Sequence, residues 1–438
     1  MLLEDEHQEY VFNTFAGSCF EVDSNVSKAI KEQDIDALDS DTRDLFLTAG
    51  ILTAPDFDER RFISYVRNRQ VHDASHISAT IVLTWKCNLS CVYCYQDKDA
   101  PAVNMTMEDA EKCILFLTKL VEKHKSKGLD ITLYGGEPLL NTTVGFHILK
   151  TLKQYCDSGD IHFSADLVTN GTLITEEILD YLSTHNCTSL QISLDGLQNM
   201  HDSRRKAKSG GGSFSQILET LKIVNDHTGI DTTIRINIDK TNLNDAHDLI
   251  KFLGVHGQGL TNCNVDFGIV REGAIASCSG YSCNCLEEGE MGEPLKALWD
   301  CAQANGFDPW TKPDRKFLFC GSAGVGTFVI SPSCEIYKCW EFVGQVEHKL
   351  GDIDEAGDFI ALNKYYDWMT VDPLKNDECR NCVYLPTCGG GCTVVSYMKH
   401  GSYHASGCFQ IKGVIEKRVL DYIKAAPLAG PQPPAEPS

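Results

Sequence analysis

From residue 81 to residue 95 the chain reads Ile81-Val82-Leu83-Thr84-Trp85-Lys86-Cys87-Asn88-Leu89-Ser90-Cys91-Val92-Tyr93-Cys94-Tyr95. An apolar, strand-like run is followed at once by three cysteines within eight residues. Three thiolates from one short loop can hold three irons of a 4Fe-4S cube and leave the fourth open to an amino and a carboxylate group. Half of a zinc site is the alternative, but zinc ligands usually come as Cys-x-x-Cys pairs, and the first gap here holds three residues. The triplet therefore favours an iron–sulfur cluster.

Composition limits the kind of protein. With 438 residues, 42% of them hydrophobic, the chain can form two or three domains with large cores. It contains no apolar run of transmembrane length, and its acidic start, Met1-Leu2-Leu3-Glu4-Asp5-Glu6, does not suit a signal peptide, so we expect a cytoplasmic protein. A net charge of -22 argues against nonspecific binding to nucleic acid or to an anionic membrane.

Cysteine is unusually frequent, with 20 residues in the chain. A disulfide framework belongs to exported and usually small proteins, so metal ligation is the better explanation. A second cysteine-dense region supports this view. It has the spacing Cys-x2-Cys-x5-Cys-x3-Cys with three flanking single cysteines, and consists of Cys320, Cys339, Cys379, Cys382, Cys388, Cys392 and Cys408. Zinc ribbons are the alternative for this region.

Strand-like and helical stretches alternate from residue 78 onward, which predicts a parallel sheet covered by helices. The strand-like runs lie at 80–84, 130–134, 164–169, 189–194, 232–238 and 264–270. Six such units predict an α/β fold with a partial (β/α)6 TIM-like barrel. In barrels of this kind the functional residues lie at the C-terminal strand ends, where the cysteine loop also falls.

Polar groups that could bind a cofactor follow the next three strands. Gly135 and Gly136 allow a ligand to approach the backbone closely, and the Glu137 carboxylate could receive an α-amino group. The third strand ends in a polar turn, and the fourth offers a serine and an aspartate suited to ribose hydroxyls. An arginine nearby can form a two-pronged bond to a carboxylate. The candidates in these later turns are Asn170, Ser193, Asp195 and Arg205, with Arg204 and Arg235 as alternatives for the arginine.

Together these motifs resemble the radical S-adenosylmethionine (SAM) enzymes that carry a SPASM extension. The resemblance implies that Cys87, Cys91 and Cys94 bind the first 4Fe-4S cluster, and that the Gly-Gly-Glu-Pro element, Ser193 and Arg205 hold SAM. It also implies two auxiliary clusters. Cys320, Cys339 and Cys392 would bind the first of these, and Cys379, Cys382, Cys388 and Cys408 the second. Electron transfer into the SAM sulfonium would give a 5′-deoxyadenosyl radical that abstracts a hydrogen from the substrate.

The chain departs from this family pattern at two places. A fourth ligand of the first auxiliary cluster is expected near position 314, which is Asp. That iron is either open or bound by Cys278, Cys283, Cys285, Cys301 or Cys334, and we favour closure by one of these cysteines. After Cys339, sulfatase maturases carry an aspartate that acts as a base, whereas this chain has Trp340-Glu341. This difference disfavours formylglycine formation.

The predicted organisation is an N-terminal module at 1–75, a radical SAM partial barrel at 78–300, a SPASM domain at 301–424 and a disordered tail at 425–438. The N-terminal pattern resembles the units with which radical SAM peptide maturases grip a leader peptide; a packing extension of the barrel is the alternative. We therefore expect a peptide maturase that forms a thioether or carbon–carbon link in a ribosomally made precursor peptide. Its electron donor would be of flavodoxin or ferredoxin type. Sulfatase-maturase-like oxidation and a nonenzymatic metal-binding module are the alternatives. No catalytic side chain, peptide or oligomeric state is assigned.

Overall fold

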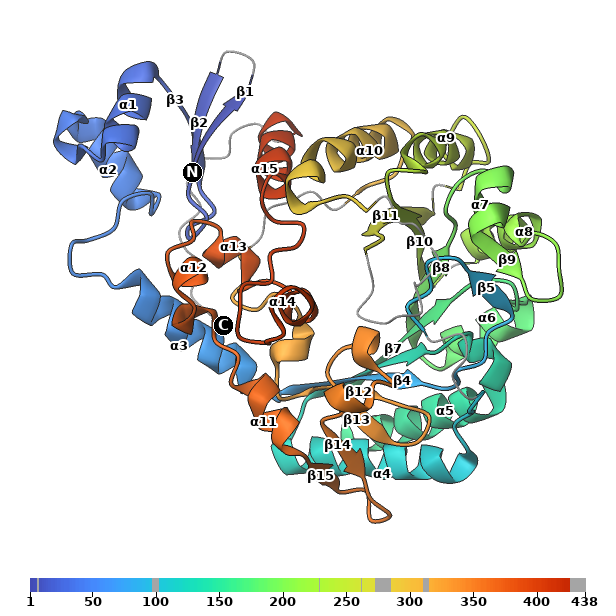
Figure 1. Ribbon diagram of the computed structural model, residues 1–438. Coiled ribbons are helices and arrows are strands. Elements are labelled where there is room, and N and C mark those ends of the chain that lie inside the picture. The colour runs from blue at the N-terminus through green and yellow to red at the C-terminus, as the bar shows by residue number, and fades with distance from the viewer. Residues whose placement is uncertain are drawn as a thin grey trace.

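The central element of the molecule is a ten-stranded sheet, which is parallel over most of its width (Figure 1). The computed structural model describes residues 1–5, 8–96, 102–227, 229–260, 262–271, 285–309 and 315–425. Six parallel strands lie in the order β11-β10-β8-β7-β6-β4. Their bounds are β4 His76–Val82, β6 Gly128–Tyr134, β7 His162–Thr169, β8 Cys187–Ser193, β10 Asp231–Ile238 and β11 Cys263–Ile269. Each predicted strand is present, and the partial-barrel prediction is confirmed.

Helices that connect these strands lie along the outer side of the sheet (Figure 1). They are α4 Met107–His124, α5 Thr142–Gly159, α6 Glu176–Thr184, α7 Gln198–Arg204, α8 Phe214–Asp226, α9 Leu243–Leu253 and α10 Gly292–Ala304. The start of α4 shows how the sequence fixes such an element. Thr106 and Asp109 form a reciprocal capping box there, and Lys125 ends the helix in the left-handed conformation.

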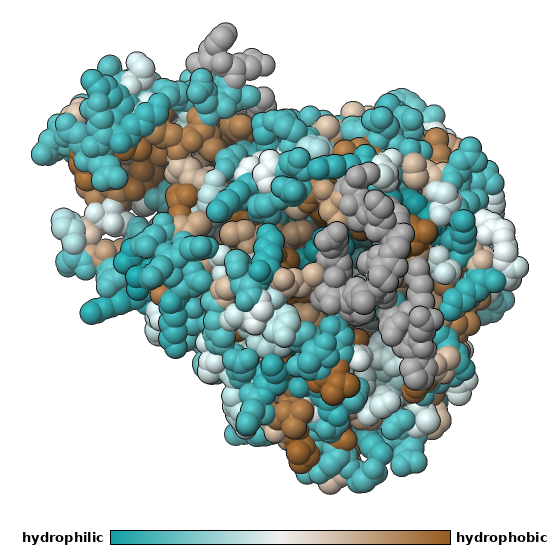
Figure 2. Space-filling view, viewed as in Figure 1, coloured by the Kyte–Doolittle hydropathy of each residue, from teal (hydrophilic) through white to brown (hydrophobic). Residues whose placement is uncertain are grey.

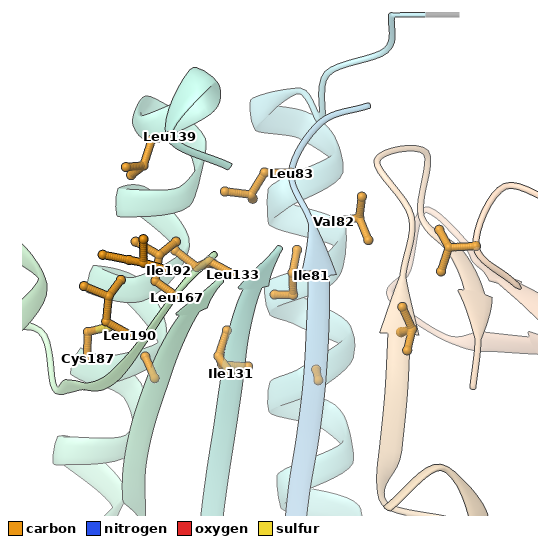
Figure 3. Close-up of a cluster of buried hydrophobic side chains, with 14 of the residues drawn as sticks. Ile81, Val82, Leu83, Ile131, Leu133, Leu139, Leu167, Cys187, Leu190 and Ile192 are labelled. Atoms are coloured by element: carbon orange, nitrogen blue, oxygen red, sulfur yellow. The ribbon is translucent and has the colours of Figure 1, made fainter. Parts of the chain in front are cut away.

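The core between sheet and helices consists of aliphatic side chains from neighbouring strands (Figure 3). Ile81, Ile131, Leu167 and Ile192 are each fully buried, and they come from four different strands of the parallel sheet. Burial of one such side chain stabilises the fold by about 1.5–3 kcal/mol. This core holds the strand ends, and therefore the loops that follow them, at fixed positions.

The cysteine-rich C-terminal part shares the same sheet. Strand β12 Thr327–Ile330 pairs in parallel with β4, and three antiparallel strands extend the sheet beyond it: β13 Glu335–Tyr337, β14 Gly351–Ile353 and β15 Phe359–Ala361. The helices of this C-terminal part are α11 Asn363–Met369, α12 Asp377–Arg380, α13 Leu385–Cys388, α14 Thr393–His400 and α15 Val414–Ala425. The sheet thus continues across the predicted boundary at residue 300, which sequence periodicity did not indicate.

The N-terminal residues form an antiparallel sheet with helices beside it. Its elements are β1 Leu2–Asp5, β2 Gln8–Phe12, β3 Cys19–Val22, α1 Ser24–Glu32, α2 Ser40–Thr48 and α3 Glu59–Val71. Leu3, Tyr10 and Phe12 pack into one buried cluster with Ile415 and Val419 of α15. This module is therefore anchored on the C-terminal part of the chain.

Apolar side chains remain exposed on the N-terminal module. Figure 2 shows a brown area on this module, at the upper left of the view. In residues 1–75, the apolar side chains that are each at least 40% exposed include Ile35, Leu45, Leu47 and Phe57. Within the described residues, no helix has the length and apolar character needed to cross a membrane.

Candidate active site

The three cysteines after β4 lie on a loop that contains one short strand and pairs through it with another. Strand β5 Leu89–Cys91 pairs antiparallel with β9 Arg205–Ala207, so that Cys91 lies opposite Arg205. The pairing continues where the Val92 N–H donates to the Arg204 carbonyl oxygen at 2.9 Å. The cysteine loop and the predicted SAM-binding arginine are therefore held side by side by backbone hydrogen bonds.

A cavity of about 1020 Å³ opens at the C-terminal ends of the parallel strands. Ligand pockets typically have about 300–1,000 Å³, so this cavity has room for a nucleoside cofactor and part of a substrate. It is lined by all three cysteines of the loop and by five of the seven predicted cofactor-binding residues: Gly135, Gly136, Asn170, Ser193 and Arg205. The structure thus brings these groups together from four strand ends.

The thiols of this loop share one electrostatic environment. Burial raises the pKa of Cys87, and burial together with Cys91 and Cys87 raises the pKa of Cys94 to about 11. The Cys87 Sγ also accepts from the Leu89 N–H at 3.4 Å and the Asn170 side-chain amide at 3.8 Å. Coordination by metal displaces such thiol protons, so this donor set fits the cluster predicted for it.

Two of the predicted cofactor-binding residues, Glu137 and Asp195, are not among the residues that line the cavity. The Glu137 carboxylate is fully buried and accepts from the Leu139 N–H at 3.0 Å, the Thr169 hydroxyl at 2.8 Å and the Asn170 N–H at 2.8 Å. These donors take three of the roughly four acceptor positions of a carboxylate. They tie the loop after β6 to the end of β7.

Asp195 is the second such residue. It is fully buried, and its Oδ1 accepts from the Asn237 N–H at 3.0 Å, while its Oδ2 is hydrogen-bonded to the Tyr93 hydroxyl. It therefore positions the aromatic residue of the cysteine loop, and the ribose role expected for it stays a prediction. Tyr93 in turn accepts from Arg205 Nη1 at 2.8 Å.

The three candidate arginines have different surroundings. Arg204 is buried and donates to Asp239 at 2.8 Å, outside the cavity lining. Arg235 lines the cavity but forms an ion pair with Asp266. Arg205 lines the cavity as well, and its buried Nε has no hydrogen-bond partner in the protein. A buried donor without a partner raises the free energy of the folded protein, and a bound carboxylate would remove this cost. Arg205 is therefore the arginine best suited to the carboxylate of the cofactor.

The side of the cavity nearest the C-terminal cysteines carries residues that sequence reasoning did not assign to it. The Tyr95 and Tyr134 hydroxyls are hydrogen-bonded at 2.5 Å, and the Tyr134 ring stacks on Trp340 with 6.2 Å between centroids. Glu341 lines the same wall and forms an ion pair with Arg271. The signals available in the sequence were the position of Tyr95 beside Cys94 and that of Trp340-Glu341 after Cys339, where sulfatase maturases carry a base.

The C-terminal cysteines fall into two groups in the structure. Burial raises the pKa of Cys339, and the nearby Glu341, Cys392 and Cys320 add to this increase, which is consistent with the three thiols lying near one another. A small cavity beside this group is lined by Cys320, Cys392 and residues 389–391. Gly391 has φ +80°, and a Cβ there would lie 2.4 Å from the Gly407 carbonyl oxygen, so glycine is required at this wall.

The second group contains the other four cysteines. Burial raises the pKa of Cys379 to about 11, with further contributions from Cys408 and Cys382, and it raises the pKa of Cys388 to about 12. Among the described residues, no three His, Cys, Asp or Glu side chains are close enough together to bind a single metal ion. Four thiolates are the usual donor set of a 4Fe-4S cluster.

Three of the spare cysteines have other contacts in the described part of the chain. Cys334 is buried in the turn between β12 and β13, and its Sγ lies 3.7 Å from that of Cys113 on α4. Cys301 donates to the His247 carbonyl oxygen between α9 and α10. Cys285 is disulfide-bonded. Cys278, Cys283 and Asp314 lie outside the described residues.

Comparison with known proteins identifies the barrel. Residues 81–253 match the family model of the Radical SAM superfamily. The chain is 23% identical to the radical SAM cyclopropyl synthase TigE of Paramaledivibacter caminithermalis, over 95% of this chain and 93% of that protein. It is 25% identical to a serine-type anaerobic sulfatase-maturating enzyme of Bacteroides thetaiotaomicron, over 70% of this chain and 80% of that one.

Solved structures show the same fold. The enzyme anSMEcpe with bound AdoMet superposes with a TM-score of 0.60 at 19% identity, covering 80% of this chain and 97% of that one. Streptococcus suis SuiB bound to its precursor peptide SuiA superposes with a TM-score of 0.54 at 16% identity, covering 92% of this chain and 96% of that one.

Proposed function

The chain is a radical SAM enzyme that uses 4Fe-4S clusters and S-adenosylmethionine, and we propose that it installs an intramolecular thioether or carbon–carbon link in a ribosomally made precursor peptide. The observation that carries this proposal is the extent of the cavity. It runs from the first cysteine loop to Trp340 and Glu341, which directly follow Cys339 of the first auxiliary group. A substrate in this cavity would lie between two sets of cluster ligands.

When bound, the first cluster and SAM supply a carbon radical that takes a hydrogen atom from the substrate. In this proposal Cys87, Cys91 and Cys94 hold the cluster, and Arg205 pairs with the SAM carboxylate. The backbone of Gly135 and Gly136 can approach the cofactor closely, because neither residue has a side chain. The buried strand ends around them exclude water from the reacting groups.

The proposed ligands of the auxiliary clusters are the two C-terminal cysteine groups. Three clusters in all would bind about twelve irons, by the four-iron stoichiometry of each cube. An electron donor of flavodoxin or ferredoxin type would reduce the first cluster, which is the one on Cys87, Cys91 and Cys94. The peptide would be gripped by residues 1–75, whose sheet is anchored to α15 and whose helices expose apolar side chains.

The comparisons favour a precursor peptide over a sulfatase as the substrate. SuiB, which was solved with its precursor peptide SuiA, covers 92% of the chain, whereas the sulfatase-maturating enzyme covers 70%. TigE matches 95% of the chain, including most of its N-terminal quarter. A cyclopropyl ring is closed by a new carbon–carbon bond, which favours that branch of the proposal. Formylglycine formation stays the second candidate, because sulfatase-maturating enzymes are among the relatives and anSMEcpe shares the fold.

The test begins with the open reading frames beside the gene for this chain, and any short peptide that they encode is prepared as the substrate. Anaerobically reconstituted enzyme, SAM and reductant should convert this peptide to a product that lacks two hydrogen atoms, and fragmentation should fail between the linked residues. Hydroxylamine should leave the product unchanged. A product that hydroxylamine captures is an aldehyde, and this result would favour formylglycine-type oxidation instead.

A further inference from the structure

Arg271 connects the cavity to the first auxiliary group of cysteines. It follows β11 and lines the cavity, and its guanidinium forms an ion pair with Glu341. Its Nη1 also lies 3.9 Å from the Cys392 Sγ, within hydrogen-bonding reach of sulfur. The guanidinium carbon stands 4.6 Å from the ring centroid of Phe409, so a cation–π contact fixes its position. One cation thus contacts a substrate-facing carboxylate and a proposed cluster ligand.

Burial strengthens these contacts. The Arg271 side chain is 18% exposed and that of Glu341 is 23% exposed, so water screens their charges only in part. A guanidinium is not deprotonated in proteins. Arg271 is therefore a cation beside the Cys392 thiol.

We propose that Arg271 is a positioning residue that sets the reduction potential of the cluster held by Cys320, Cys339 and Cys392, with Glu341 as its counter-charge. Reduction adds one negative charge to a cluster, so a nearby cation favours the reduced form and a nearby anion opposes it. Hydrogen bonds to sulfur and net charge are the means by which proteins adjust such potentials. The inference rests on the proposed auxiliary cluster but not on the peptide or the bond formed.

The charges predict opposite effects for two matched substitutions. Arg271→Gln should lower the reduction potential of one auxiliary cluster, and Glu341→Gln should raise it. We expect at least a tenfold change in the oxidised-to-reduced ratio in each case, which is about 59 mV for a one-electron couple. Arg235→Gln is the control, because Arg235 lines the same cavity but pairs with Asp266. It should leave that potential unchanged.

The measurement is a redox titration of full-length, anaerobically reconstituted protein followed by electron paramagnetic resonance. Replacement of Cys87, Cys91 and Cys94 by Ala in every sample removes the first cluster, so that only the auxiliary clusters titrate. One signal should move with Arg271→Gln and Glu341→Gln. The other, from the cluster on the remaining four cysteines, should not move and serves as an internal reference.

Shifts of opposite sign in the two variants support the inference. Equal potentials in wild type and Glu341→Gln, or shifts of the same sign in both variants, overturn it, because a merely structural role does not depend on the sign of the charge. If Arg271→Gln fails to assemble its cluster, Glu341→Gln alone decides. Fewer than about eight irons in the background protein would instead refute the proposed auxiliary clusters.

Discussion

Replacement of Arg205 by Gln removes the cation that the structure places in the cavity without a partner for its Nε. Gln keeps a polar group near the Tyr93 hydroxyl, to which Arg205 Nη1 donates at 2.8 Å. Arg205 lies opposite Cys91 in a backbone ladder that a side-chain change does not break. The variant should therefore keep its iron and lose affinity for SAM.

The size of the loss follows from the kind of contact. A hydrogen bond to a charged group is worth about 1.5–3 kcal/mol, and every 1.4 kcal/mol is a factor of about ten in Kd. Arg205 is 6% exposed, so water screens this contact only weakly. We expect SAM to bind about ten- to a hundredfold more weakly to Arg205→Gln.

Equilibrium dialysis of SAM with anaerobically reconstituted protein measures this change. Arg235→Gln is the matched control, since Arg235 lines the cavity but already pairs with Asp266, and its Kd should change less than threefold. Unchanged affinity in Arg205→Gln, combined with a tenfold loss in Arg235→Gln, would transfer the role to Arg235 and refute the assignment.

Three further predictions concern groups outside the cofactor contact. Glu137→Gln should lower the free energy of unfolding by about 2–5 kcal/mol in denaturant titrations. The reason is that the buried carboxylate accepts from three donors, and the amide NH2 of Gln would face one of these donors with a donor of its own. Wild-type stability combined with weaker SAM binding would indicate that Glu137 contacts SAM directly. Burial lowers the pKa of His201 to about 4. The imidazole is protonated near pH 6.5 in the unfolded chain but stays neutral in the folded chain, so this group lowers the free energy of unfolding by about 2 kcal/mol from pH 7 to pH 5. The free energy of unfolding should therefore fall less steeply with decreasing pH in His201→Gln than in wild type. Parallel pH profiles of the two proteins would contradict this. Cys334→Gly should keep all of its iron, because Cys334 packs beside Cys113 and its φ of +61° is a conformation that glycine adopts readily. Cys320→Ala should lose about four irons. Iron loss in Cys334→Gly would indicate that Cys334 is a cluster ligand.

Sequence periodicity was sufficient to predict the strands of the barrel, because buried parallel strands are continuous apolar runs such as Ile81-Val82-Leu83. The division of the C-terminal cysteines into two ligand sets came from the resemblance to enzymes with a SPASM extension, since spacing alone does not assign them. Sequence position could not predict side-chain direction. Glu137 and Asp195 follow strands as cofactor ligands do, yet both are fully buried and hydrogen-bonded within the protein. The ion pair between Arg271 and Glu341 joins residues 70 positions apart, which no local pattern indicates.

Formation of 5′-deoxyadenosine from SAM under reducing, anaerobic conditions tests the central claim most directly. The account predicts that reconstituted wild-type protein produces it. The triple variant Cys87→Ala, Cys91→Ala, Cys94→Ala should produce none and should contain about four fewer irons, with the auxiliary clusters intact. Reductive cleavage of SAM by this triple variant, or stoichiometric zinc in wild-type protein isolated without oxygen, would contradict the account.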